Sequence, residues 1–158
     1  MSEDITYRLM IPEEAPDVSA LVRVVFDEFI GPEYTQQGID EFHKFIEPAA
    51  LNERILADHF VMIAVDKEVP VGMIEIRQNN HVSLLFVDRN FQNHGIAKTL
   101  LSQALLKATK FESGLSRVTV NTSRQGVRTY EKLGFRQTGP EREVNGIIFI
   151  PMAKRLEP

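Results

Sequence analysis

One segment of the sequence joins a glycine to the start of a helix, as anion-binding loops do. Residues 92–97 (QNHGIA) follow an apolar run at residues 84–87 and lead into a long helical pattern. A helix N-terminus leaves backbone N–H groups unpaired and carries a positive partial charge, so a loop that wraps tightly into it can bind an anion, above all a diphosphate. Gly95 can adopt a positive φ and lets a ligand approach the backbone, while Ala97 keeps the first helical turn slim. A glycine that merely begins a helix after a turn gives the same local pattern, so both interpretations stand at this point.

Apolar periodicity predicts the elements that position this loop. It indicates a strand at residues 5–11, helices at 18–29 and 39–46 with a shorter helical piece after Pro48, and strands at 60–65, 71–76 and 81–87. A helix from Gly95 to Ala108, a strand at 117–121, a helix at 126–133 and a last strand at 147–152 complete the pattern.

The order of these elements, β-α-α-β-β-β-α-β-α-β-β, predicts an α/β fold, or α+β with a mixed sheet, that has helices on both faces. A right-handed crossover through the helix at Gly95 should make residues 84–87 parallel to residues 118–120. Because no repeat or linker interrupts the pattern, residues 1–158 are expected to form a single domain.

Two segments resemble the signatures of the GCN5-related N-acetyltransferase (GNAT) family. Residues 92–97 resemble its Q/R-x-x-G-x-G/A motif, and residues 120–135 (VNTSRQGVRTYEKLGF) resemble its second signature, a strand end followed by a helix with a tyrosine and Leu-Gly-Phe. The similarity covers nearly the whole chain and implies the GNAT acyl-CoA N-acyltransferase fold. Two positions depart from the family pattern. Ala97 replaces the second glycine, and Ser123 stands where an asparagine is common, so Asn121 either takes over its contact or bonds its own turn.

The resemblance implies acetyl-CoA as co-substrate and no metal. The N–H groups of residues 93–97 would hold the diphosphate, and the pantetheine arm would lie beside residues 85–87, where a bulge splays the strand from its parallel neighbour. The N–H of Leu85 would bind the thioester oxygen as an oxyanion donor. The cofactor-binding residues implied in this way are Leu85, Phe86, Val87, Gln92, Asn93, His94, Gly95, Ile96, Ala97, Asn121 and Tyr130.

Three residues are candidates for proton transfer. In the family motif, Tyr130 would protonate or hydrogen-bond the departing thiolate; the alternative is a ring that packs in the core. An alkylamine with a pKa near ~10 must lose a proton before it attacks. His81 lies eleven residues before Gln92, where several family members place a glutamate base. Glu75 on the preceding strand is the other candidate. The alternatives are an exposed strand-start histidine for His81 and a charge on the solvent face for Glu75.

The amino-acid composition excludes several classes of binding partner and of chemistry. Eighteen basic and twenty-two acidic residues give a net charge of −4, which provides no electrostatic footprint for nucleic acid. The absence of cysteine excludes disulfides, zinc-thiolate sites and cysteine nucleophiles. The acidic start lacks the apolar core of a secretory signal, and no run approaches the roughly 20 apolar residues of a membrane span. We therefore expect a cytoplasmic protein without a membrane partner, and a homodimer is one option for its assembly.

These observations lead to an N-acetyltransferase that moves the acetyl group of acetyl-CoA to a primary amine of a small molecule or peptide, by direct attack in a ternary complex. The acidic residues of the region before residue 48 suit a cationic amine, although a solvated helix face has the same composition. The alternative function is a non-catalytic acyl-CoA-binding or sensing module with the same fold, and a further one is an unrelated phosphate-binding protein.

Overall fold

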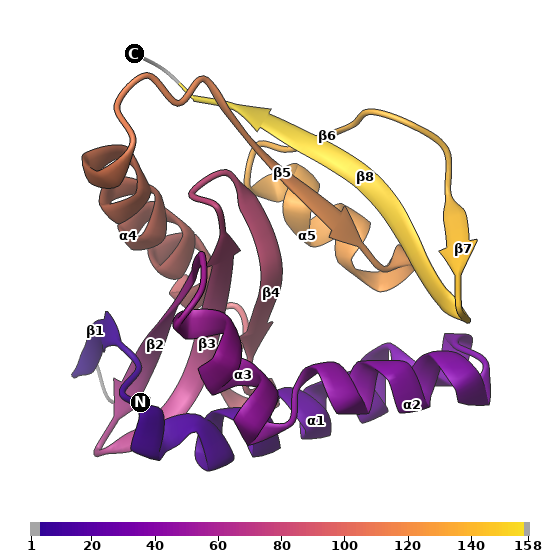
Figure 1. The fold of residues 1–158 in the computed structure, drawn as a ribbon, viewed down its shortest axis with the longest axis horizontal. Helices are drawn as coiled ribbons and strands as arrows, with labels where there is room; N and C mark the ends of the chain where they lie inside the picture. The colour runs from indigo at the N-terminus through magenta and orange to yellow at the C-terminus, as the bar shows by residue number, and fades with distance from the viewer. Residues whose placement is uncertain (1–3, 157–158) are drawn as a thin grey trace.

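The computed structural model describes residues 4–156, which form a mixed sheet with helices on both faces (Figure 1). The strand order in the 8-stranded sheet is β1-β2-β3-β4-β5-β8-β6, and β7 pairs with β8. The strands are β1 (Ile5–Leu9), β2 (His59–Asp66), β3 (Val69–Arg77), β4 (His81–Val87), β5 (Arg117–Thr122), β6 (Arg136–Gln137), β7 (Arg142–Val144) and β8 (Ile147–Arg155). The α-helices are α1 (Ala15–Phe29), α2 (Gln36–Phe45), α3 (Pro48–Ile55), α4 (Ile96–Phe111) and α5 (Val127–Lys132).

This architecture confirms the predicted mixed fold and differs from the predicted order in two places. Three helices rather than two lie between β1 and β2, since the piece after Pro48 forms a helix of its own. After α5 there are three strands rather than the two predicted. Two of them, β6 and β7, are only two and three residues long. Elements this short show no periodicity in the sequence.

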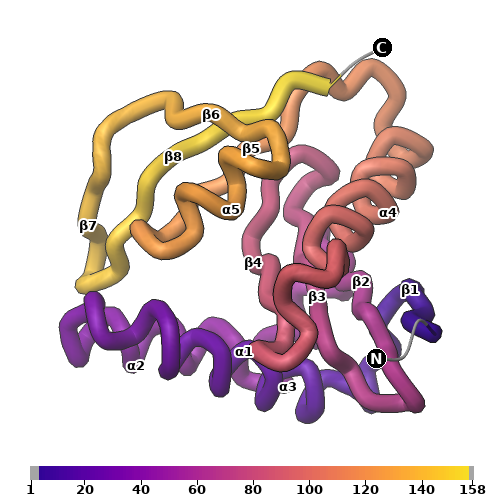
Figure 2. Tube along the Cα trace, turned by 180° about the vertical axis from the view of Figure 1, so that it is seen from behind, coloured from indigo at the N-terminus to yellow at the C-terminus, as the bar shows by residue number. Residues whose placement is uncertain are grey.

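Two hydrophobic layers cover the sheet. On one face α1 and α3 pack against β2, β3 and β4. On the other face, α4 and α5 pack against the central strands together with β5 and β8, and Figure 2 shows both helices there. The helix α2 extends past this core and contacts β8. Just before α2, the Tyr34 hydroxyl donates a hydrogen bond to the Ile148 carbonyl of β8 (3.0 Å). The gap between β4 and β5 is thus spanned on one side by α2.

The parallel pair β4 and β5 separates soon after it forms. It pairs at two positions, His81 with Thr119 and Val82 with Val120. On the other side of β4, Val82 pairs with Ile76 and Leu84 with Glu75, so Ser83 has no partner on β3 and forms a bulge. A bulge bends a strand and increases its twist. As a result, the rest of β4 diverges from β5.

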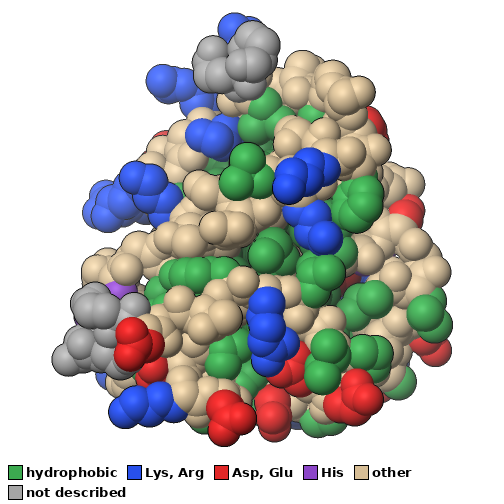
Figure 3. All heavy atoms as spheres, turned by 90° about the vertical axis from the view of Figure 1, so that its left-hand side faces the viewer, with side chains coloured by type: hydrophobic (Ala, Val, Ile, Leu, Met, Phe, Trp, Pro, Cys, Tyr) green, Lys and Arg blue, Asp and Glu red, His purple; other side chains and the backbone are tan. Residues whose placement is uncertain are grey.

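Charge is unevenly distributed over the surface. On the side of the molecule shown in Figure 3, basic side chains predominate in the upper half and acidic side chains lie along the lower edge. Among residues 4–156, no helix is both long enough and apolar enough to span a membrane.

Candidate active site

A cleft of about 500 Å³ occupies the space between the diverging strands. The end of β4 and the loop before α4 form one wall, and β5 and α5 form the other. Residues of α1 and α2 close one end, so the cleft runs from the start of α4 to an apolar chamber beneath the N-terminal helices. The separation of β4 from β5 therefore creates a channel with two differently built ends.

The loop at the start of α4 has the backbone geometry of an anion site. Gly95 caps the helix with a φ of 80°, and Asn93 also adopts a positive φ of 66°. The Thr99 N–H donates to the Gly95 carbonyl (3.0 Å), so the N–H groups before it lie ahead of the first helical hydrogen bond. The side chain of Gln92 donates to the Val87 carbonyl (3.1 Å) and ties the loop to the end of β4. A Cβ on Gly95 would meet no atom within 4 Å, which leaves the backbone open to a ligand.

Most of the residues predicted to bind the cofactor meet in this cleft. All of them except His94 line it, although they come from β4, the loop, β5 and α5. The Ser123 hydroxyl accepts a hydrogen bond from the Gly126 N–H (3.2 Å), so it caps the turn before α5. Asn121 is exposed and lines the cleft. Two lysines that the sequence interpretation did not single out, Lys98 and Lys132, also line the cleft.

Tyr130 has features of both interpretations. The residue is 7% exposed, and its ring meets Phe135 edge-on, with 5.2 Å between the ring centroids. The residue also lines the cleft, and its hydroxyl makes no hydrogen bond to any residue of the range 4–156. Burial raises the pKa of Tyr130, so the phenol stays protonated at neutral pH and can act as a donor.

His81 lies at the start of β4 and does not line the cleft. It is partly buried, and its Nδ1 is 2.8 Å from the Thr119 hydroxyl. Burial, with the charges of Arg77 and His59, lowers the pKa of His81 to about 4. The bulge also changes its orientation relative to Leu85. Residues 81 and 85 of a regular strand face the same way, whereas here Val82 and Leu84 belong to opposite hydrophobic layers.

Glu75 is fully buried on β3, so it does not lie on a solvent face. Arg54 of α3 binds both of its oxygens, with Nε 2.7 Å from Oε2 and Nη2 3.0 Å from Oε1. Nδ1 of His59 lies 2.6 Å from the same Oε2. Arg54 also stacks on the Phe45 ring at 3.7 Å and donates to the Phe45 carbonyl (2.7 Å). This cluster fastens α3 and the end of α2 to the sheet, and Glu75 does not line the cleft.

The far end of the cleft is aromatic. Phe26 and Phe42 stack with 3.9 Å between their ring centroids, and Phe86 of β4 lies 6.0 Å from Phe42. Tyr34 completes this wall, and burial together with the charge of Glu33 raises the pKa of its phenol to about 12. Helical periodicity marked several of these residues as core, but it could not show that their rings face a cleft.

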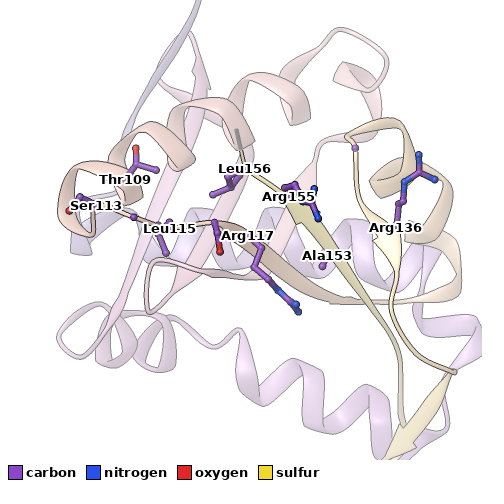
Figure 4. A pocket seen from close by; sticks show the side chains of 11 residues that line it. Thr109, Ser113, Leu115, Arg117, Arg136, Ala153, Arg155 and Leu156 are labelled. Atoms are coloured by element: carbon purple, nitrogen blue, oxygen red, sulfur yellow. The ribbon is translucent and has the colours of Figure 1, made fainter. Parts of the chain in front are cut away.

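A larger hollow of about 1350 Å³ lies elsewhere, at the ends of β5 and β8 (Figure 4). Arg117, Arg136 and Arg155 line it, and Arg117 pairs with Arg155 across the strands. The hollow contains none of the residues predicted for the site.

Comparison with known proteins agrees with this architecture. The profile of the acetyltransferase (GNAT) domain family matches residues 30–156. Peptidyl-lysine N-acetyltransferase YjaB of Salmonella typhimurium is 31% identical over 111 residues, which cover 66% of this chain and 73% of YjaB.

Two solved structures share the fold over 99% of this chain. One is a GCN5-related N-acetyltransferase from Rhodopseudomonas palustris, with a TM-score of 0.83, 19% identity and 98% of that chain covered. The other is the PaiA N-acetyltransferase of Thermoplasma acidophilum in complex with coenzyme A, with a TM-score of 0.82, 20% identity and 100% of that chain covered.

The protein is therefore an acetyltransferase. The family match further shows that the chain belongs to the GNAT family.

Proposed function

We propose that the protein transfers the acetyl group of acetyl-CoA to a primary amine by direct attack in a ternary complex. The observation that carries this proposal is the cleft between β4 and β5. The loop with positive φ at Asn93 and Gly95 lies at one end, aromatic side chains lie at the other, and Tyr130 lies on the wall between them. The coenzyme A bound to PaiA, a protein of the same fold, supports acetyl-CoA as the donor.

The loop and the strand edge would hold the donor. The N–H groups of residues 93–97 would bind the diphosphate, and Lys98 and Lys132 add positive charge to the cleft. Pairing of β4 with β5 ends at Val82, so the edge of β4 that follows can bind the pantetheine amides as a neighbouring strand would. Leu85 lies on this edge, and its N–H would donate to the thioester oxygen as negative charge develops there.

The chain then has two tasks during transfer. The C–N bond forms as the C–S bond breaks, so a thiolate leaves and the attacking nitrogen must lose a proton. Burial keeps Tyr130 protonated, so its phenol would donate its hydrogen to the departing sulfur. Water in the cleft would then return a proton to the phenolate, whose raised pKa favours this step. Neither His81 nor Glu75 lines the cleft, and both oxygens of Glu75 are bound by Arg54. We therefore propose that the amine proton passes to water in the cleft.

The aromatic end of the cleft would bind the acceptor. An alkyl chain can pack against the rings of Phe42 and Phe86 while its amine points toward Leu85, since these three residues line the same cleft. YjaB is named as a peptidyl-lysine N-acetyltransferase, which supports an alkylamine as the reacting group.

Two measurements test this function. Calorimetry should show binding of acetyl-CoA, and thiol release should follow when a panel of amines, including lysine peptides, diamines, aminoglycosides and amino acids, is added. Tight binding of acetyl-CoA without thiol release from any amine would favour the non-catalytic acyl-CoA-binding module. Binding of simple nucleotides as tightly as CoA would contradict both functions.

A further inference from the structure

The two halves of the sequence carry opposite net charges. Residues 1–95 contain seven basic and seventeen acidic side chains, whereas residues 96–158 contain eleven basic and five acidic ones. The cleft lies where the halves meet, since α1, α2 and β4 come from the first and β5 and α5 from the second. Lys98 and Lys132 line the cleft, and its lining contains no acidic residue of the described range 4–156.

One acidic side chain reaches across the acceptor end of the cleft. Glu33 precedes the cleft residue Tyr34 and accepts a hydrogen bond from the side-chain amide of Gln125, which also lines the cleft. Its other oxygen lies 3.6 Å from a guanidinium nitrogen of Arg124. That guanidinium is already bound by Glu141 through two hydrogen bonds of 2.6 and 2.5 Å. Two carboxylates therefore share one cation, and the group keeps a net charge of −1.

Two acidic residues of α1, Asp27 and Glu28, each have a basic partner of their own. Asp27 lies 2.7 Å from His43, and Glu28 lies 2.7 Å from Arg89. Neither shares its basic partner with a second carboxylate in any contact within residues 4–156. Glu33 is also the one of these three whose contact joins the N-terminal helices to the start of α5, across the cleft.

We propose that Glu33 binds a second cationic group of the acceptor, so that the preferred substrates are amines with an additional positive charge, such as linear diamines. This inference rests on the proposed function and names its acceptor class. The reacting amine must be neutral, whereas the second ammonium stays protonated and takes the place of the neutral Gln125 amide beside Glu33. A charged donor forms a stronger hydrogen bond to a carboxylate than a neutral amide does.

The test compares linear diamines of increasing length with the amino alcohols of the same length, in wild type and three variants. We expect higher kcat/KM for the diamine of the best length than for its amino alcohol. Glu33→Gln should reduce the diamine value by about tenfold, mainly through KM, and leave the amino alcohol value nearly unchanged. Glu28→Gln is the matched control and should change neither value.

The variant Arg124→Gln distinguishes binding of the acceptor's second ammonium by Glu33 from a purely structural role of the Glu33 contact. Removal of the guanidinium leaves the carboxylate of Glu33 without its cation, so the KM for the diamine should fall. If the contact only held the two halves together, both Glu33→Gln and Arg124→Gln would weaken binding of every acceptor. That result, or a diamine preference that survives in Glu33→Gln, would overturn the inference and leave the acetyltransferase function in place.

Calorimetry of the diamine with the CoA-bound protein gives a readout that does not need turnover. Binding that depends on Glu33 without any thiol release would contradict the proposed function but support the cationic subsite. Equal affinity of wild type and Glu33→Gln for the diamine would refute the subsite, whatever the turnover.

Discussion

Replacement of Tyr130 by phenylalanine should reduce turnover far more than stability or CoA affinity. The substitution removes one oxygen and keeps the ring, so the edge-on contact with Phe135 at 5.2 Å persists and no cavity forms. Within the described residues the hydroxyl has no hydrogen-bond partner, so the free energy of unfolding should change by less than about 1 kcal/mol.

The expected loss of turnover is larger than the loss of stability, because the phenol acts on the transition state of the reaction. A general acid typically contributes on the order of 10²-fold, which corresponds to about 2.7 kcal/mol of activation free energy. Since the group acts on the leaving sulfur rather than on bound CoA, kcat should carry the loss. The raised pKa of the phenol also predicts that kcat in wild type does not fall through ionisation of Tyr130 at neutral or mildly alkaline pH.

The assay measures thiol release at saturating acetyl-CoA, with calorimetry of CoA and thermal unfolding on the same samples. Tyr7→Phe is the matched control, because Tyr7 packs against the same hydrophobic layer but lies outside the cleft. An equal loss of turnover and of CoA affinity in Tyr130→Phe would show a packing role instead. An unchanged kcat would exclude Tyr130 as the acid.

Three other perturbations probe the loop, the buried ion pair and the histidine. Gly95→Val should abolish CoA binding, measured by calorimetry, because the added side chain occupies the open side of the loop where the ligand would lie. It should also destabilise the fold by about 1–2 kcal/mol, measured by thermal unfolding, because a side chain at φ 80° is strained. Arg54→Met should reduce the free energy of unfolding by about 3–5 kcal/mol in urea titration, since it removes the guanidinium that binds both oxygens of the buried Glu75 carboxylate and leaves only His59 beside it. The lowered pKa of His81 means that the folded state favours the neutral imidazole. The free energy of unfolding should therefore be highest above pH ~6.5 and fall as the pH drops toward 4, where the unfolded chain binds the proton first. In thermal unfolding, His81→Gln should flatten this fall.

Each of the first two changes has a control in the same chain. Gly114 has a φ of 90° and open surroundings but lies outside the cleft, so Gly114→Val should destabilise the fold similarly and leave CoA binding unchanged. The Arg8–Glu14 pair is exposed, and Arg8→Met should therefore change stability by less than about 1 kcal/mol. Loss of CoA affinity in Gly114→Val, or equal effects of the two arginine changes, would contradict the reasoning.

The His81 prediction also bears on catalysis. If His81 were the base, the rate would rise with pH near 4, the pKa that burial gives it, and His81→Ala would remove that rise. A rise near the pKa of the amine that survives in both His81→Ala and Glu75→Gln would report the acceptor itself. Loss of the rise in Glu75→Gln alone would identify Glu75 as the base and contradict proton transfer to water.

The features that could be predicted from the sequence are those that depend on neighbouring residues. The strand, glycine and helix around Gly95 are consecutive, and so are the residues that place Tyr130 between the end of β5 and Leu-Gly-Phe. Local backbone preferences and helical periodicity act over a few residues, so such segments can be recognised before any fold is known. The same holds for β4, which begins and ends at the predicted residues 81 and 87.

The faces that side chains share and the partners of the charged groups could be read only from the folded chain. The bulge at Ser83 sends Val82 and Leu84 to opposite layers, although alternation along the sequence puts them on the same one. Glu75 looks like a surface carboxylate in its strand, but Arg54 of α3, 21 residues away, reaches it in the core. Glu33 and Gln125 are 92 residues apart and meet only because the sheet and α2 bring both to the cleft. Contacts of this kind depend on strand register and on how the helices pack, and no periodicity within one segment records either.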